Sequence, residues 1–280
     1  MKMNIKSIFS HIILFFISIL ALFPFLWLIS TSLKGIDENI FSYPPTFIPT
    51  DFTFNNYIGV WGKVDFLKYF FNSFIVAFFT VVMNLLFSSM AAYPLARMEF
   101  NGKKITFFAI LATIMIPFQA IMLPIYLIIL KLNLVDTISP INGYLGLILP
   151  FAVSAFGIFL MRQAFITIPK ELEEAAIIDG CNSVQIFFKV LLPLVKPTLT
   201  VLAIFTFIGS WGEFLWPSIV LTEEKMFTLP VGINNLQGIF SANWRYIAAG
   251  SIISIIPIII FFLSLQKYFV SGENEGAIKG

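Results

Sequence analysis

Long stretches without a charged residue are the feature that most constrains how this 280-residue chain folds. A charge at the centre of a bilayer costs about 2.5–3.5 kcal/mol, so an uncharged apolar run of roughly 20 residues is typical of a membrane-spanning helix. Six runs meet this description, namely residues 7–33, 69–96, 105–130, 138–161, 197–221 and 246–266, with Glu213 as the one interruption. A further uncharged run, Met226–Trp244, is rich in Gly, Pro, Asn and Gln and is interpreted as a loop. The pattern predicts an all-α integral membrane protein with six transmembrane helices.

The composition excludes several other classes of protein. Hydrophobic residues make up 59% of the chain and charged residues 11%, against about 25% charged in soluble domains. The 17 basic and 15 acidic side chains cannot cover the surface of a soluble enzyme, and a net charge of +2 provides no basic patch for nucleic acid. With one cysteine and one histidine, the chain offers no disulfide framework and no metal site, and we expect no catalytic residues.

The distribution of Lys and Arg predicts the orientation. With both termini in the cytoplasm, 11 of the 17 basic residues fall on the inner side, as the positive-inside rule requires. The first run is longer than the roughly 7–15-residue core of a signal peptide, so we expect it to be retained as a helix. The predicted order is a cytoplasmic N-terminus (1–6), an outer loop (34–68), a core (69–268) and a cytoplasmic tail (269–280). Within the core, 162–196 is cytoplasmic and 222–245 is an outer loop.

The cytoplasmic segment 162–196 predicts two helices separated by a turn. Pro169 suits the first position of a helix, and Gly180 suits the left-handed conformation that ends one. Asn182 and Gln185 then have the spacing of a capping box for a second helix. A helix lying on the membrane surface would explain the apolar residues that follow. The two alanines beside Glu174, Ala175 and Ala176, followed by a helix-ending glycine, favour a short helix that docks against another protein. The two interpretations fit about equally well.

Residues in this segment resemble the EAA loop of ABC importer membrane subunits. Glu174-Ala175-Ala176, Gly180 after three residues and Val190-x-Leu192-Pro193 after nine more match its pattern, with Val190 in place of the usual Ile. The resemblance implies a type I permease fold in which this loop docks on a cytoplasmic ATPase and follows its movement. The coupling residues that it implies are Glu174, Ala175, Ala176, Asp179, Gly180, Leu192 and Pro193.

The likeness extends over nearly the whole chain and is strongest to the second-subunit permeases of the maltose type, in the carbohydrate branch of that family. Trp211-Gly212-Glu213-Phe214-Leu215-Trp216-Pro217 resembles its W-N-E-F-L-W-P stretch, with Gly212 in place of Asn. The terminal Gly276–Gly280 resembles its G-A-V-K-G tail, whereas Glu273-Asn274-Glu275 departs from it. The implied partners are an ATPase dimer, a second and distinct permease subunit, an extracytoplasmic binding protein and a carbohydrate, in the inner membrane of a prokaryote.

The chain contains no G-x-x-x-x-G-K-[ST] motif, so we expect no cofactor in it and place ATP and Mg²⁺ on the separate ATPase. Glu213 within a span is a functional-site hypothesis, although an interfacial position explains it equally well. Trp211 and Trp216, on either side of it, have flat faces that suit sugar rings, and an amide such as Gln119 would be costly against lipid. The candidate translocation pathway is therefore Gln119, Trp211, Gly212, Glu213 and Trp216.

Other functions fit the sequence less well. A secondary carrier commonly shows internal repeats and several buried ionisable residues, and the chain shows neither. Motifs of an intramembrane enzyme are also missing. An ABC importer for another small polar substrate, such as a glycerol phosphate or an amino acid, remains the main alternative.

Overall fold

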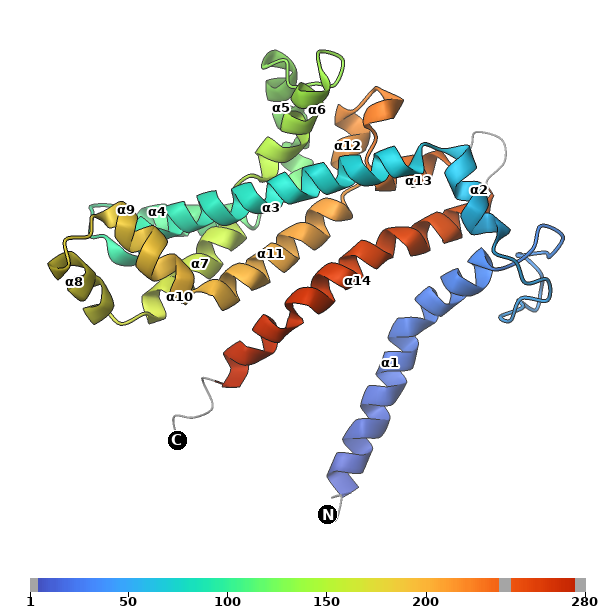
Figure 1. Cartoon of the computed structure of the whole chain (residues 1–280), viewed down its shortest axis with the longest axis horizontal. Helices are drawn as coiled ribbons and strands as arrows, with labels where there is room; N and C mark the ends of the chain where they lie inside the picture. The colour runs from blue at the N-terminus through green and yellow to red at the C-terminus, as the bar shows by residue number, and fades with distance from the viewer. Residues whose placement is uncertain (1–4, 237–242, 275–280) are drawn as a thin grey trace. The chain divides into compact units, whose positions relative to one another are not determined.

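The computed structural model describes residues 5–236 and 243–274, and this part of the chain is helical with one isolated β-bridge (Figure 1). The elements in order are α1 (Ile5–Ser32), α2 (Asn55–Lys63), α3 (Phe66–Arg97), α4 (Lys103–Thr113), α5 (Phe118–Lys131), α6 (Pro140–Ile148), η1 (Leu149–Phe151), α7 (Ala155–Thr167), α8 (Glu171–Ile178), α9 (Ser183–Gln185), the π-helical η2 (Ile186–Leu191), α10 (Leu192–Leu194), α11 (Lys196–Trp211), α12 (Leu215–Val220), η3 (Glu224–Met226), α13 (Leu229–Asn235) and α14 (Trp244–Asn274). The terminal Gly276–Gly280 lies outside the described residues.

Helix length and composition define the candidate membrane spans. Three single helices are long and apolar enough to cross a bilayer, at Phe9–Ser32, Phe66–Arg97 and Trp244–Lys267. Three further pairs of helices pass the same test but are bent between their members, by 99° for α4 and α5, by 55° at Phe151–Ala155, and by 80° before α11. The described residues therefore supply three spans, or up to six if each bent pair makes one.

Three of the runs expected to be single helices are divided, two of them at prolines. Pro117, which has no N–H to donate, stands in an extended conformation before α5 and separates it from α4. In the next run, η1 contains Pro150, and Ser154 then caps α7 by accepting a hydrogen bond from the N–H of Gly157 at 3.0 Å. The run 197–221 is also divided, because the backbone leaves the helix at Gly212 and resumes at Leu215.

Contacts divide the chain into two compact units, Met1–Leu67 with Gly232–Ile256 and Lys68–Val231 with Pro257–Gly280. In the first unit, the segment after α1 folds around a buried ion pair. Lys34 Nζ lies 3.5 Å from Glu38 Oε1 and donates to the carbonyl oxygen of Thr46 at 2.6 Å. Glu38 Oε2 accepts from the N–H groups of Thr50 and Asp51 at 2.9 and 3.2 Å. These bonds fix the start of the predicted outer loop.

The pKa of Glu38 reflects these contacts. Burial alone would raise it, but hydrogen bonds from Asp51, Thr46 and Thr50 outweigh burial and lower the pKa from 4.5 to about 2. Because the folded-state pKa lies below the ordinary value, the carboxylate stabilises this unit above pH 4.5, and that contribution is lost as the pH falls toward 2.

We therefore expect Glu38→Gln to lower the midpoint of thermal unfolding by about 5 °C at pH 7, since hydrogen bonds to a charged group are lost. The difference from the wild type should shrink between pH 4.5 and 2, where the wild-type carboxylate itself becomes protonated. Glu99→Gln is the matched control, because the Glu99 side chain is 91% exposed. A difference that stays constant over this pH range would contradict the prediction.

The second unit contains most of the segment 69–268 that was predicted as the core, whereas residues 232–256 belong to the first unit. In Figure 1, α3 runs beside α7 and α11, and α8 and α9 lie at the end of this unit where α3 ends. A cluster of buried apolar residues joins these helices, including Leu95 of α3, Phe165 of α7, Phe187 of η2 and Leu202 of α11. This cluster is the support on which the segment around α8 rests.

Candidate functional site

The helix α8 is short because sequence signals at both ends limit it. It begins at Glu171, two residues after Pro169, so the proline precedes the helix instead of occupying its first position. At the other end Gly180 has a φ of +82°. The N–H groups of Gly180 and Cys181 bond the carbonyl oxygens of Ile177 and Ala176 at 3.0 and 2.9 Å. This is a complete Schellman motif, in which a glycine ends the helix.

One face of α8 is attached to the rest of its unit. Ala176 is 7% exposed and belongs to the same buried cluster as Phe165 and Phe187. On the first turn, Glu173 forms an ion pair with Arg97, whose Nε lies 2.7 Å from Oε1. Arg97 also donates through its NH2 group to the carbonyl oxygen of Ile168. The end of α3 therefore holds both the start of α8 and the segment before it.

The opposite face of α8 is free. Glu174, Ala175, Asp179 and Gly180 are exposed, and two large apolar residues beside them, Ile177 and Ile178, are 60% and 85% exposed. Of the EAA triplet, Glu174 and Ala175 face outward and Ala176 packs inward. Exposed apolar side chains next to a carboxylate, on a helix fixed from behind, make a surface suited to contact with another protein.

The second helix of the segment begins as the sequence predicted. Asn182 Oδ1 accepts from the N–H of Gln185, and Gln185 Oε1 accepts from the N–H of Asn182, both at 2.9 Å, which completes a capping box. The helix continues through the π-helical η2, where Ile186, Phe187 and Leu191 are buried. Leu192 is half-buried and Pro193 is exposed, and these two predicted coupling residues belong to α10 and not to the exposed face of α8.

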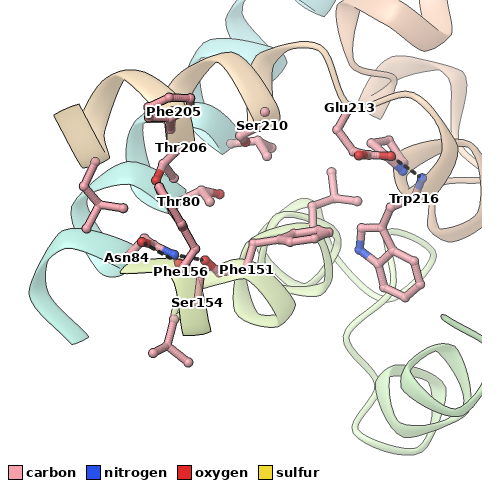
Figure 2. Close-up of a pocket in the computed structure, with 16 residues that line it drawn as sticks. Thr80, Asn84, Phe151, Ser154, Phe156, Phe205, Thr206, Ser210, Glu213 and Trp216 are labelled. Atoms are coloured by element: carbon pink, nitrogen blue, oxygen red, sulfur yellow. Dashed lines mark hydrogen bonds between the residues drawn. The ribbon is translucent and has the colours of Figure 1, made fainter. Parts of the chain in front are cut away.

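A second feature of this unit is a cavity of about 300 Å³ between α3, α7, α11 and the start of α12 (Figure 2). Its walls are apolar except for six side chains: Thr80, Asn84, Ser154, Thr206, Ser210 and Glu213. Phe151, Phe156 and Phe205 supply much of the apolar surface. A mainly apolar hollow with a few converging polar groups is the usual form of a small-molecule site.

Two helix interruptions beside this cavity, before α7 and before α12, bring polar groups to its wall. Asn84 Nδ2 donates to the carbonyl oxygen of Phe151 at 2.9 Å, at the break between η1 and α7. Ser154, which caps α7, lies within 3.4 Å of Asn84 Oδ1. At the other break, Glu213 Oε1 accepts from the N–H of Trp216 at 3.0 Å. Irregular backbone at membrane depth is tolerated where it is buried in protein or lines a cavity.

The structure separates the five predicted pathway residues. Glu213 and Trp216 line the cavity, although Trp216 is fully buried and donates its indole N–H to the carbonyl oxygen of Gly146 at 3.1 Å. Trp211 is also buried, with its ring stacked on Phe207. Gln119 is exposed and Gly212 lies outside the lining. Neither tryptophan offers a free ring face in this conformation.

Several residues of these two sites were not predicted from the sequence. Arg97 and Glu173 are 76 residues apart in the chain, so no local pattern pairs them. Thr80 also drew no attention, yet it is 1% exposed, lines the cavity and has a hydroxyl that no described group bonds. Its position as a polar residue in the middle of a predicted span is the one sequence signal that could have identified it.

With its candidate membrane spans, a helix with an exposed apolar face and a mainly apolar cavity with a few polar groups, the chain has the features of a membrane permease. Residues 84–273 match the family described as binding-protein-dependent transport system inner membrane component. The chain is 39% identical to the arabinooligosaccharides transport system permease protein AraQ of Bacillus subtilis, covering 94% of this chain and 92% of that one. It is 33% identical to the sn-glycerol-3-phosphate transport system permease protein UgpE of Yersinia enterocolitica, covering 95% of each.

A solved structure, described as a bacterial ABC transporter involved in the import of the acidic polysaccharide alginate, aligns with a TM-score of 0.80 at 29% identity, over 95% of this chain and 96% of that one. The chain therefore belongs to the family of binding-protein-dependent transport system inner membrane components. Its fold is that of a type I importer permease, as the sequence predicted.

Proposed function

We propose that this chain is the permease subunit of an ATP-driven importer that moves a sugar or oligosaccharide across the cytoplasmic membrane. The observation that carries the proposal is the exposed face of α8. The helix is held by the ion pair of Glu173 with Arg97 and by the buried Ala176, and it ends at Gly180. A helix held in this way can receive the movement of a cytoplasmic ATPase dimer and pass it to α3 and α7. AraQ, similar over almost the whole chain, supports an oligosaccharide as the substrate.

In this proposal the chain itself catalyses no reaction. ATP and Mg²⁺ bind to the ATPase dimer, a second permease subunit completes the pathway, and an extracytoplasmic binding protein delivers the saccharide. Both termini and α8 face the cytoplasm. The absence of a phosphate-binding loop from the sequence and the excess of Lys and Arg on that side support this arrangement.

The proposal is tested by purifying the tagged chain from its native membrane and reconstituting the recovered complex in vesicles. We expect an ATPase and a second permease to co-purify, and uptake of a neutral oligosaccharide to require ATP and the binding protein. A chain that purifies alone and transports without ATP would contradict the proposal.

A variant of α8 sharpens this test. We expect Glu174→Ala to reduce the recovered ATPase about tenfold, because one charged contact at an interface contributes about 1.4 kcal/mol or more. The amount of chain in the membrane should stay unchanged, because Glu174 is exposed. Glu171→Ala, an exposed glutamate at the start of the same helix, is the matched control. Equal recovery of the ATPase with Glu174→Ala and with the wild type would contradict the assignment of α8 as the docking helix.

A further inference from the structure

The polar side chains of the cavity are neutral or acidic, and none of them is basic. Five of the six carry a hydroxyl or an amide, and the sixth, Glu213, carries a carboxyl group. No lysine, arginine or histidine is among the described residues that line the cavity. An anion transferred from water into such a site would leave its charge without a partner, which costs far more than the transfer of a hydroxyl that finds hydrogen bonds.

At the two helix starts beside the cavity, a side chain of this chain bonds one backbone N–H that could otherwise attract an anion. The N-terminus of α7 reaches the cavity, but Ser154 accepts the hydrogen bond of the Gly157 N–H there. At the start of α12, the N–H of Trp216 is bonded to the Glu213 carboxyl group. One N–H at each helix start is therefore bonded by a side chain of this chain, and one of these side chains is acidic.

Hydroxyl groups, in contrast, remain available to a neutral solute. The hydroxyl of Thr80 is buried on the cavity wall and bonds no described group. A buried hydroxyl without a hydrogen-bond partner is unfavourable, and a ligand hydroxyl that bonds it removes this cost. Thr206 and Ser210 are half-buried on the neighbouring α11 and face the same hollow (Figure 2).

We infer that this cavity is selective by charge: it accepts neutral polyhydroxylated solutes and excludes anionic ones, with Glu213 as the residue that repels them. This inference rests on the proposed function and assigns a charge class to its substrate. On this inference the chain does not carry the anionic substrates that two similar proteins name, a glycerol phosphate and an acidic polysaccharide.

The charge selectivity is tested without knowledge of the substrate. In the assembled complex, Cys181→Ala removes the single cysteine of this chain, and Ser210→Cys places a thiol on the cavity wall. The thiol is treated separately with a cationic methanethiosulfonate, the trimethylammonium-ethyl reagent, and with the anionic sulfonatoethyl reagent of similar size. The mass gain of this chain gives the two rates, and their ratio is divided by that of a free thiol in solution.

The Glu213 carboxylate is expected to make the normalised ratio of cation to anion about 10, because it attracts the cationic reagent and repels the anionic one. Glu213→Gln should return the ratio to about 1, because the amide keeps the shape of the side chain without its charge. Glu223→Gln is the matched control: its side chain is 46% exposed and lies outside the cavity lining, so the ratio should stay near that of the parent.

A normalised ratio of one or less, or the same ratio with and without the Glu213 carboxyl group, would overturn the inference. Failure of both reagents to react would also overturn it, since the cavity would then be closed to solutes. These results leave the proposed function standing if ATP-driven uptake of an oligosaccharide is observed. A chain that shows the expected ratio but purifies without an ATPase would instead refute the proposed function alone.

Discussion

Replacing Arg97 by alanine is expected to abolish most of the transport while leaving the protein in the membrane. The Arg97 and Glu173 side chains are 5% and 18% exposed, so the substitution leaves a largely buried carboxylate without its partner. Breaking such a pair costs about 3–5 kcal/mol, and 1.4 kcal/mol changes an equilibrium tenfold. The first turn of α8 would leave its place at the end of α3, and we expect uptake in membrane vesicles to fall by about a hundredfold.

Matched variants separate loss of the ion pair from loss of folding. Glu173→Gln keeps the shape of the acid and should lose less than Arg97→Ala, because Arg97 retains its bond to the carbonyl oxygen of Ile168. The pair of alanine substitutions together should cost less than the sum of the two alone, as in any double-mutant cycle across a direct contact. Lys103→Ala removes a basic residue six positions along the chain whose partner, Glu99, is exposed, and should have little effect. Strictly additive effects of Arg97→Ala and Glu173→Ala would contradict the coupling.

Local signals predicted the region around α8 well. Gly180 ends α8 and the Asn182–Gln185 capping box begins the next helix, because each depends on backbone groups no more than five residues away. The same limit explains what could not be predicted. The contact of Glu173 with Arg97 joins segments far apart in the chain, and only the tertiary packing of α3 against α7 brings them together.

Hydropathy predicted which segments are apolar but not where their backbone bends. Pro94, Pro124 and Pro257 lie inside helices, whereas Pro117 lies at the break between α4 and α5. A proline removes the same hydrogen bond in each case, so the outcome depends on whether neighbouring groups compensate for it. The sequence likewise did not predict which way the side chains point. Trp211 and Trp216 are buried against protein, and Glu213 reaches the cavity because the chain leaves the helix at that point.

Gly180→Ala is expected to reduce uptake about tenfold, and a second glycine of this chain provides the control. At a φ of +82°, a side chain with a Cβ costs about 1–2 kcal/mol, and no atom lies within 4 Å of the place where that Cβ would be, so the cost is backbone strain and not a clash. Relief of the strain would break the Schellman bonds of Gly180 and Cys181 and turn the exposed end of α8 away from its partner. Gly180→Asn should recover much of the activity, because asparagine tolerates this conformation.

Gly102 stands before α4 with a φ of +86° and equally open surroundings. Gly102→Ala therefore imposes nearly the same strain on the backbone without touching α8. If the Gly180 effect arises from loss of stability alone, both variants should lose thermal stability and uptake to the same extent. If α8 must present its C-terminal end to an ATPase, the two should lose similar stability, and only Gly180→Ala should lose uptake and ATPase recovery. The comparison thus isolates the orientation of α8 from the energy needed to hold it.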